Sequence, residues 1–350
     1  MKHFFTGLAF AFSSAAFCQE IVFTSAQTFS KEDMNSFYSS VTVSNDWVLF
    51  NANDYKLYAY RKDGTLAWQA YIRRKSNIPP FIVQNNVWVN GNDDNHTHVK
   101  IFSLADGSLK KDTDFEIRTT PMIRNGVLYS TGISNGGCVF AYDLKTDSLI
   151  WERFIAHGCS QYPYYPPEKI IANAEGDNWI ELNYQGHLID PKCEDSTISF
   201  PSELKCVKTF DVLTHDGLPV SGKRSERWLA NEAITGYSTN HTFFLQNDKL
   251  IILGKKLREK STIDLYSWFE NKDFNEYAKK SIIHADDEKL SILLNNHFII
   301  YNHKQRKIET LLDLTQWEPH QITSDNDKIW FISAKDGLLR AKRIKEVKEE

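Results

Sequence analysis

The sequence predicts an all-β fold, a β-propeller of four-stranded antiparallel blades, and we expect seven blades. Three observations predict it. Polar hairpin turns recur at intervals of about 40 residues, the length of one propeller blade. The clearest repeat unit holds four short strands, and tryptophans recur on the last strand of a unit. The turns are Ser44–Asp46, Gln84–Asn86, Arg124–Gly126, Gln246–Asp248, Ala285–Asp287 and Asp325–Asp327, with a seventh expected near Glu175–Gly176.

The chain opens with a basic start, Lys2 and His3, followed by an apolar run from Phe4 to Phe17. This pattern is typical of a signal peptide and is too short to span a membrane. We therefore expect residues 1–18 to be a signal peptide and the mature protein to be exported, periplasmic or extracellular. Cys18 also permits a lipid anchor, but the bulky Phe17 before it disfavours that alternative.

Residues 118–154 form the clearest unit. Its first hairpin turns at Asn125–Gly126, and both residue types tolerate positive φ. The strand Cys138–Asp143 and the strand Ser148–Arg153 complete four antiparallel strands. Similar pairs of strands precede and follow the turns at Asp63–Gly64 and Asp106–Gly107. Trp68 and Trp151 fall at the same repeat position, on the outer strand, where a large ring can cover the gap between blades.

The middle of the chain is less regular. The segments 169–172 and 179–182 are interpreted as the first hairpin of a fourth blade, with 208–212 and 218–220 completing it. An insertion of about residues 186–206 interrupts this blade. Residues 19–345 are taken as one propeller domain, and residues 346–350 as a frayed tail. Ile21–Thr24 is expected to pair with the last unit and close the ring, which removes exposed sheet edges.

The stretch from Ala141 to Trp151 resembles the repeat of PQQ-like (quinoprotein-type) β-propellers, usually Ala-x-Asp-x-x-Thr-Gly-x-x-x-Trp. Asp147 replaces the usual glycine, and the unit ending at Trp68 is one residue shorter with Arg61 in place of the aspartate. The resemblance implies the propeller fold over most of residues 39–345. The resemblance also implies a role similar to that of the outer-membrane assembly scaffold branch of the family. The dehydrogenases of the family use adjacent cysteines, which this chain lacks, so we expect no quinone and no other cofactor.

Four cysteines remain after residue 18, and in an exported protein they are disulfide candidates. They are Cys138, Cys159, Cys193 and Cys206. Cys193 and Cys206 bracket part of the insertion, and Cys138 and Cys159 lie on or near successive strands, but the pairing stays open. Cysteine and histidine spacings typical of zinc sites do not occur. The polar stretch Asn92–His98 falls where a solvated loop is expected, so we predict no metal site.

Composition excludes other classes of function. The net charge is −4 over 350 residues with both signs interspersed, so no basic stripe indicates nucleic-acid binding. No later segment is long and apolar enough to be a transmembrane helix. The sequence contains no Gly-x-Ser-x-Gly nucleophile elbow. We therefore expect a binding protein rather than an enzyme, without a metal or catalytic residues.

The segment from His157 to Pro167 joins the third and fourth blades and is rich in tyrosine and proline. Stiff aromatic loops suit protein recognition because little side-chain entropy is lost on binding. We predict binding through His157, Tyr162, Tyr164 and Tyr165. The alternative is that these rings pack over the blade junction or line the central channel.

The sequence thus predicts a monomeric, exported propeller that binds another envelope or secreted protein as an assembly scaffold. Two other functions stay open. One is a periplasmic inhibitor or immunity protein directed against a toxin or hydrolase. The other is a hydrolase or lyase that acts on a polysaccharide at the central channel.

Overall fold

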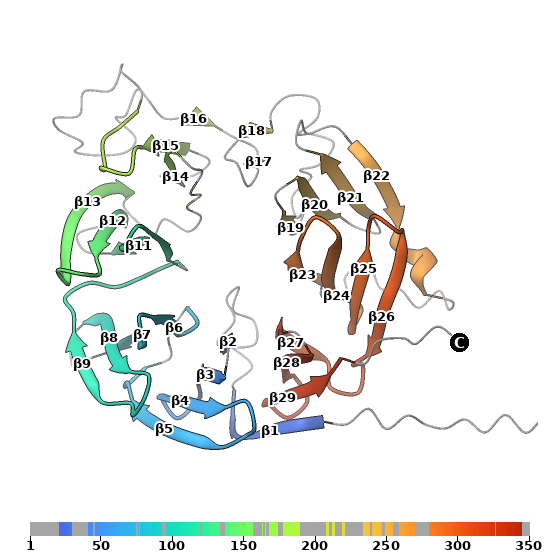
Figure 1. Cartoon of the computed structure of the whole chain (residues 1–350), viewed down its shortest axis with the longest axis horizontal. Coiled ribbons are helices and arrows are strands. Elements are labelled where there is room, and N and C mark those ends of the chain that lie inside the picture. Colours follow the sequence, from blue (N-terminus) through green and yellow to red (C-terminus); the bar gives the residue numbers. More distant parts are fainter. Residues whose placement is uncertain are drawn as a thin grey trace, which may run out of the picture.

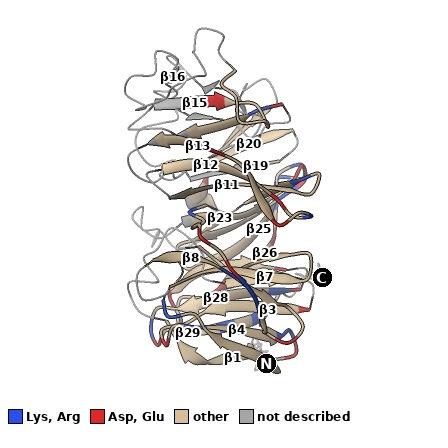
Figure 2. Cartoon of the chain, turned by 90° about the vertical axis from the view of Figure 1, so that its left-hand side faces the viewer, with Lys and Arg blue, Asp and Glu red and all other residues tan. Residues whose placement is uncertain are grey.

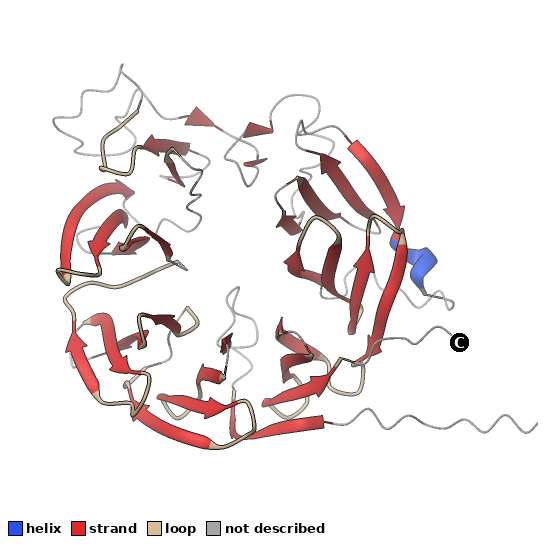
Figure 3. Cartoon of the chain, viewed as in Figure 1, coloured by secondary structure: helices blue, strands red, loops and turns tan. Residues whose placement is uncertain are grey.

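The computed structural model contains sheets arranged in a ring around a central axis, and Figure 1 follows the chain around it from blue to red. Almost all described elements are strands, with the short η3 (Leu265–Trp268) as an exception (Figure 3). The structure describes residues 21–29, 41–44, 46–74, 76, 78–92, 96–119, 121–133, 137–156, 163, 165, 168–173, 178–189, 208–209, 212–213, 219–220, 234–238, 240–246, 249–254, 259–269, 280–325 and 327–344.

The strands group into blades in chain order. Blade 1 contains β2 (Val41–Ser44), β3 (Trp47–Asn51), β4 (Lys56–Arg61) and β5 (Leu66–Tyr71). Blade 2 contains β6 (Phe81–Val83), β7 (Asn86–Asn92), β8 (Thr97–Ser103) and β9 (Leu109–Asp112). Blade 3 contains β10 (Met122–Arg124), β11 (Val127–Ile133), β12 (Gly137–Asp143) and β13 (Ser148–Ala156). Blade 4 contains β14 (Ile170–Asn173), β15 (Asn178–Leu182) and β16 (Lys208–Thr209).

The second half of the ring follows the same plan. Blade 5 contains β19 (Ile234–Tyr237), β20 (His241–Gln246), β21 (Lys249–Gly254) and β22 (Glu259–Asp264). Blade 6 contains β23 (Lys280–Ala285), β24 (Lys289–Leu294), β25 (His297–Asn302) and β26 (Lys307–Asp313). Blade 7 contains β27 (Pro319–Ser324), β28 (Lys328–Ser333), β29 (Leu338–Arg343) and β1 (Ile21–Thr28). The hairpin of β17 (Val212–Leu213) and β18 (Pro219–Val220) comes between blades 4 and 5 in the chain.

The predicted fold class is confirmed. Among the described residues, six sheets have four antiparallel strands and blade 4 contributes a three-stranded sheet, so the blade count is consistent with seven. The four strands predicted in residues 118–154 appear as β10 to β13, with β12 pairing Ala141 opposite Trp151.

The expected closure of the ring is also confirmed. β1, from the start of the described chain, pairs antiparallel with β29 and becomes the outer strand of blade 7 (Figure 1). The Leu339 amide donates to Ser25 Oγ at 3.0 Å, and the Phe29 amide donates to the Gly337 carbonyl at 2.8 Å. The first and last described strands therefore share one sheet, and the edge of β29 is covered.

The hydrophobic core lies between blades rather than within a single layer. Consecutive residues of a second strand, such as Val48, Leu49 and Phe50, are all fully buried. Because neighbouring side chains of a strand point to opposite faces, such a strand must be covered on both sides. Val48 and Phe50 pack in a cluster with blade 7, whereas Leu49 packs with blade 2. Each blade is thus held between its two neighbours.

The predicted role of the outer-strand tryptophans is confirmed at two blade junctions. Trp68 donates its indole N–H to the Leu104 carbonyl of the next blade at 2.8 Å, and Trp151 donates to the Tyr184 carbonyl at 3.2 Å. Each ring lies on a glycine of positive φ, Gly107 or Gly186. A Cβ at Gly107 would stand 2.6 Å from the Trp68 ring.

The same junction also occurs where the ring closes. Phe23 pairs with Ala341 just before a register shift, as Trp68 pairs with Ala59 and Trp151 with Ala141. Its ring lies 3.5 Å from the position of a Cβ on Gly64, the turn glycine of blade 1. Three junctions therefore place an aromatic ring of an outer strand against a turn glycine of the following blade.

Two of the turns that were expected to connect the first and second strands of a blade instead connect the second and third strands. The turn at Gln246–Asp248 connects β20 to β21, the second and third strands of blade 5, because β19 precedes them in the sheet. The hairpin β14–β15 also consists of a second and a third strand. Its side chains pack with Tyr129 of blade 3 in the same way as those of β7 and β8, the second and third strands of blade 2, pack with blade 1. The interpretation of this pair as a first hairpin was wrong, because turn composition does not distinguish one hairpin of a blade from the next.

The outer strand of blade 4 is interrupted. Leu188 bridges Leu182, and the Ile189 amide donates to the Glu181 carbonyl at 3.1 Å. Further along the same edge of β15, Lys208 and Thr209 of β16 pair with Trp179 and Asn178. Residues 190–207, which include most of the predicted insertion, lie outside the described residues.

The blades give the ring two distinct ends. One end, which we call the turn face, carries the turns between first and second strands and between third and fourth strands. The other end, the connector face, carries the loops between second and third strands and the connectors that lead to the next blade, such as residues 72–80 and 113–121.

We expect Gly107→Ala to lower the free energy of unfolding by about 2–4 kcal/mol, because a Cβ would combine a strained positive φ with overpacking against Trp68. Gly126→Ala is the matched control, since Gly126 also has positive φ but nothing lies within 4 Å of its Cβ position. Urea denaturation of both variants measures the effect. Equal losses in the two variants would contradict the proposed ring-on-glycine packing.

Candidate functional site

The predicted binding residues fall mostly outside the described part of the chain. His157, Tyr162 and Tyr164 are not among the described residues. Tyr165 is described, and its hydroxyl donates to the Tyr129 carbonyl at 3.3 Å in the junction between blades 3 and 4. Burial raises the pKa of the Tyr165 hydroxyl far above its usual range, so the group stays neutral. The binding role of the segment stays a prediction, and Tyr165 itself packs over the blade junction.

The disulfide candidates are likewise only partly covered. Cys138 is buried on β12, and it lies in the cluster between blades 2 and 3. Cys159, Cys193 and Cys206 lie outside the described residues. The disulfide hypothesis therefore stays a prediction.

Buried asparagines fix the connectors at the connector face. The Ser76 amide donates to Asn51 Oδ1 at 2.7 Å, at the end of β3. At the equivalent end of β7, Asn90 is fully buried, donates to the Ile117 carbonyl at 2.6 Å and accepts from the Ile117 amide at 3.2 Å. In both cases a second-strand asparagine replaces a missing β-ladder partner, so the connector backbone is held in one position.

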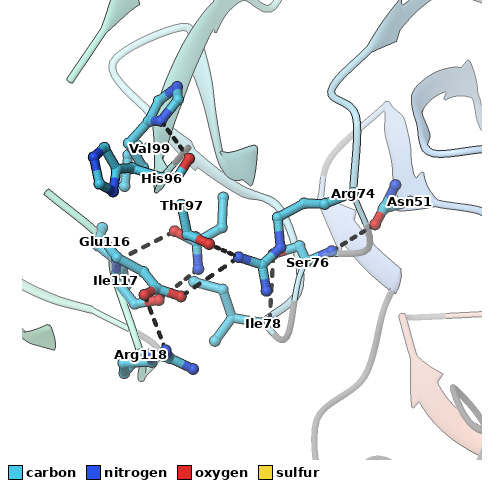
Figure 4. Close-up of polar contacts among 12 residues, drawn as sticks. Asn51, Arg74, Ser76, Ile78, His96, Thr97, Val99, Glu116, Ile117 and Arg118 are labelled. Atoms are coloured by element: carbon cyan, nitrogen blue, oxygen red, sulfur yellow. Dashed lines mark hydrogen bonds and ion pairs between the residues drawn. The ribbon is translucent and has the colours of Figure 1, made fainter. Parts of the chain in front are cut away.

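A charged cluster lies between these two connectors (Figure 4). Glu116, from the connector of blades 2 and 3, contacts Arg118 on its own connector and Arg74 on the preceding one. The Glu116 Oε2 to Arg118 Nη2 distance is 3.0 Å, and the Glu116 Oε1 to Arg74 Nη1 distance is 3.8 Å. Arg74 also donates to Thr97 Oγ1 at the start of β8. We call Arg74, Glu116 and Arg118 the connector cluster.

Burial is uneven across the connector cluster. The Glu116 side chain is 6% exposed, whereas the side chains of Arg74 and Arg118 are 26% and 27% exposed. Burial lowers the pKa of Arg74 and the Glu116 charge opposes this shift, but an arginine side chain stays protonated. One buried carboxylate therefore faces two partly exposed guanidinium groups.

Among the described residues, Glu116 and Arg118 each have a buried polar atom without a hydrogen-bond partner. These atoms are Glu116 Oε1 and Arg118 Nε, although Oε1 keeps its ion pair with Arg74. The connector of Arg118 is fixed, since its amide donates to the Thr131 carbonyl at 2.8 Å. A preorganised, partly exposed pair of guanidinium groups of this kind binds carboxylates or phosphates.

The sequence analysis did not identify the connector cluster. Arg74 belongs to the basic run Arg73–Lys75, and Glu116 and Arg118 flank Ile117 in a later segment without a motif. The signal that would have found them is their position, since both segments follow a fourth strand in successive repeats. Over the described parts of blades 2 and 3, Lys and Arg positions are interspersed with Asp and Glu positions (Figure 2), so the cluster is a local feature.

A second polar cluster joins blades 5 and 6 and contains serine, histidine and aspartate. Asp287 accepts from Ser238 Oγ at 2.6 Å and from the Asn240 amide at 2.8 Å. The hydrogen bond from Ser238 holds the Asp287 pKa well below its usual range. Ser238 donates to the carboxylate and accepts from the His241 amide, so its proton is not directed to an imidazole as in a catalytic triad. The cluster ties two turns together.

Among the described residues, no group of three or more His, Cys, Asp or Glu side chains is arranged to hold a metal ion. Within the same residues, no helix combines the length and the apolar character needed to cross a membrane.

Comparison with known proteins gives similarity in fold only. No protein-family model matches the chain, and no curated protein matches it in sequence. The solved structure of BBS1N in complex with ARL6DN has 9% identity and a TM-score of 0.54, covering 93% of this chain and 96% of the other. The computationally designed protein Ika8 has 10% identity and a TM-score of 0.52, covering 93% and 99%.

BamB from Moraxella catarrhalis has 13% identity and a TM-score of 0.47, covering 89% of this chain and 84% of the other. The two structures with the higher TM-scores support the ring of blades over nearly the whole chain. The resemblance to PQQ-like repeats stays a prediction at the level of the family.

We expect Glu116→Gln to lower the free energy of unfolding by about 2 kcal/mol, because the two partly exposed guanidinium groups lose the buried carboxylate that lies between them. Glu318→Gln is the control: its ion pair with Lys335 at 3.5 Å has both side chains 53% exposed and should contribute less than about 1 kcal/mol. Urea denaturation at low and high salt measures both. If Glu116→Gln proves no more costly than Glu318→Gln, the carboxylate does not hold the connectors together.

Proposed function

We propose that the protein is a non-catalytic, exported β-propeller that binds another protein in the cell envelope through its connector face. The observation that carries the proposal is the connector cluster, where Arg74 and Arg118 share the single buried carboxylate of Glu116. The two guanidinium groups are partly exposed, and the Arg118 connector is fixed by backbone hydrogen bonds, which suits recognition of an acidic residue on a partner.

The chemistry of the partner follows from the charge balance. A chain with a net charge of −4 repels an extended polyanion, so nucleic acid is a poor fit. A single aspartate or glutamate side chain, or a chain-terminal carboxylate, can instead accept two parallel hydrogen bonds from one guanidinium group. We therefore assign an acidic protein segment to the connector cluster.

The predicted loop of His157, Tyr162 and Tyr164 belongs to the same proposal. It leaves β13 at Ala156, which pairs with Gly137 at the connector end of blade 3. This connector follows the two that carry the connector cluster, so aromatic and cationic groups on consecutive connectors would serve one partner. BBS1N, which has a similar fold, was solved in complex with ARL6DN, so a fold of this type can support a protein complex.

A capture experiment tests the proposal. Wild-type protein, the double variant Arg74→Gln/Arg118→Gln and the control Lys335→Gln serve as baits for an envelope extract, with retained proteins quantified by mass spectrometry. Lys335 lies in the loop between β28 and β29, on the same face. We expect a specific partner on the wild-type and control baits and at least about tenfold less on the double variant, since each charge-assisted hydrogen bond contributes about 1.5–3 kcal/mol.

The double variant must first match the wild-type circular dichroism spectrum, because Glu116 loses both partners in it. The captured protein is then titrated at increasing salt, and its affinity should fall as the cluster is screened. Capture that is equal on all three baits would remove the connector cluster from the binding site.

A further inference from the structure

Three blade junctions repeat one arrangement, and the junction between blades 2 and 3 departs from it in both partners. Lys111 on β9 pairs with Ile101 just before a register shift, which is the position of Trp68 in blade 1 and of Trp151 in blade 3. In the next blade, Asp147 with φ of 55° occupies the turn position that Gly107 occupies in blade 2. An aromatic ring on glycine is thus replaced by a lysine on an aspartate.

The replacement pair is held by hydrogen bonds. Lys111 Nζ donates to Asp147 Oδ2 at 2.7 Å and to the Tyr142 hydroxyl oxygen at 2.6 Å. Burial opposes the charge of Lys111, but the hydrogen bonds to Asp147 and Tyr142 outweigh it and raise the lysine pKa. The ammonium group is therefore drawn toward the turn of blade 3, and it does not fill the volume of an indole ring.

A second aromatic position is also lost at this junction. Trp47 directly follows the first turn of blade 1 and packs in the cluster between blades 1 and 2. Asn86 directly follows the corresponding turn of blade 2. Two large rings at the first junction therefore correspond to two polar residues at the second.

A cavity of about 210 Å³ opens at this place. Its apolar walls are Val83, Trp88, Ile101 and Leu144. Its polar lining consists of Gln84, Asn86, Lys110, Lys111 and Asp147. Leu144 is equivalent to Leu104, whose carbonyl accepts the Trp68 indole N–H, so the cavity occupies the site that a tryptophan ring fills at the neighbouring junction.

We propose that this cavity, between blades 2 and 3 on the turn face, binds an aromatic side chain of a partner polypeptide, with tryptophan the best fit. A buried apolar cavity of about 150 Å³ accepts a benzene ring, so 210 Å³ suits an indole. The chemistry of the occupant follows from the repeat, since the equivalent space is filled by an aromatic ring at three other junctions.

The surroundings favour a partner polypeptide as the source of the ring. Leu66, Leu109 and Leu149 occupy equivalent positions on the outer strands of blades 1, 2 and 3, and they are 42%, 52% and 48% exposed. Ile150 beside them is 51% exposed. Leu109 belongs to blade 2, and Leu149 and Ile150 belong to blade 3, so the outer strands of both blades that line the cavity expose apolar side chains that a partner segment can cover.

The junction between blades 5 and 6 shows that the ring need not come from an outer strand. Ser261 takes the position of Trp68 there, as judged from its pairing with Ile252 before a register shift. Trp268 of η3 instead lies 4.8 Å from the Tyr301 ring, and Tyr301 is the residue equivalent to Tyr142. A ring supplied from outside the blade is thus already part of this fold.

The binding test uses N-acetyl-L-tryptophanamide as the probe, followed by NMR line broadening on titration with the full chain. We expect saturable binding with a Kd in the millimolar range, as for a small fragment. The filled variant Lys111→Trp/Asp147→Gly restores the ring-on-glycine arrangement and should weaken binding at least tenfold. Asp147→Gly alone is the matched control, because it removes the ion pair but leaves the cavity open, and it should still bind.

Asn86→Trp is a second filled variant in case the first does not fold, since it copies Trp47 of blade 1. Circular dichroism and thermal unfolding report on folding, and a filled cavity should raise the melting temperature. Absence of saturable binding to the wild type, or equal binding by a folded filled variant, would overturn the proposal. So would a crystal structure with a side chain of the same molecule seated in the cavity.

Discussion

Contact between adjacent blades is the constraint on which this structure depends. Second and third strands bury both faces, as the fully buried run from Val48 to Phe50 shows, so no blade completes its core alone. A stack of such sheets would leave one apolar face open at each end. The pairing of β1 with β29 joins the first and last described strands in one sheet, so blade 7 packs against blade 1 and each covers the apolar face of the other.

This constraint also decides where polar chemistry can occur. Between the blades, a polar side chain must find a partner, as Asn90 does on the Ile117 backbone. At the connector face the backbone leaves the ladder, and side chains must satisfy it. The connector cluster forms at that boundary: Glu116 is buried with its connector, whereas Arg74 and Arg118 reach the surface. The rigidity of the site comes from the blades, and its charge comes from the connectors.

The sequence predicted the parts of the fold that depend on local chemistry. Asn125 and Gly126 have positive φ, and Trp68 and Trp151 recur at one position of the repeat. Both features follow from short-range steric rules, so both could be predicted from the sequence. The phase of blades 4 and 5 was not predictable in this way, because a hairpin turn has the same composition between any two strands. Closure by β1 was predicted because an exposed sheet edge is unfavourable wherever it occurs.

The candidate site was hidden from the sequence for a different reason. Arg74 and Glu116 lie on separate connectors and meet only because consecutive blades place their connectors side by side. The cavity between blades 2 and 3 was visible in principle, since Asp147 departs from the repeat glycine. Its meaning required the partner position, Lys111, because the cost of a side chain at this turn depends on whether an aromatic ring packs on it. In a repeat protein, each position of one unit can be compared with the equivalent position of the other units. Where both members of a repeated contact change together, the space that the aromatic ring would fill must be occupied in another way: by Trp268 of the same chain at the junction of blades 5 and 6, and by a partner in our proposal for blades 2 and 3.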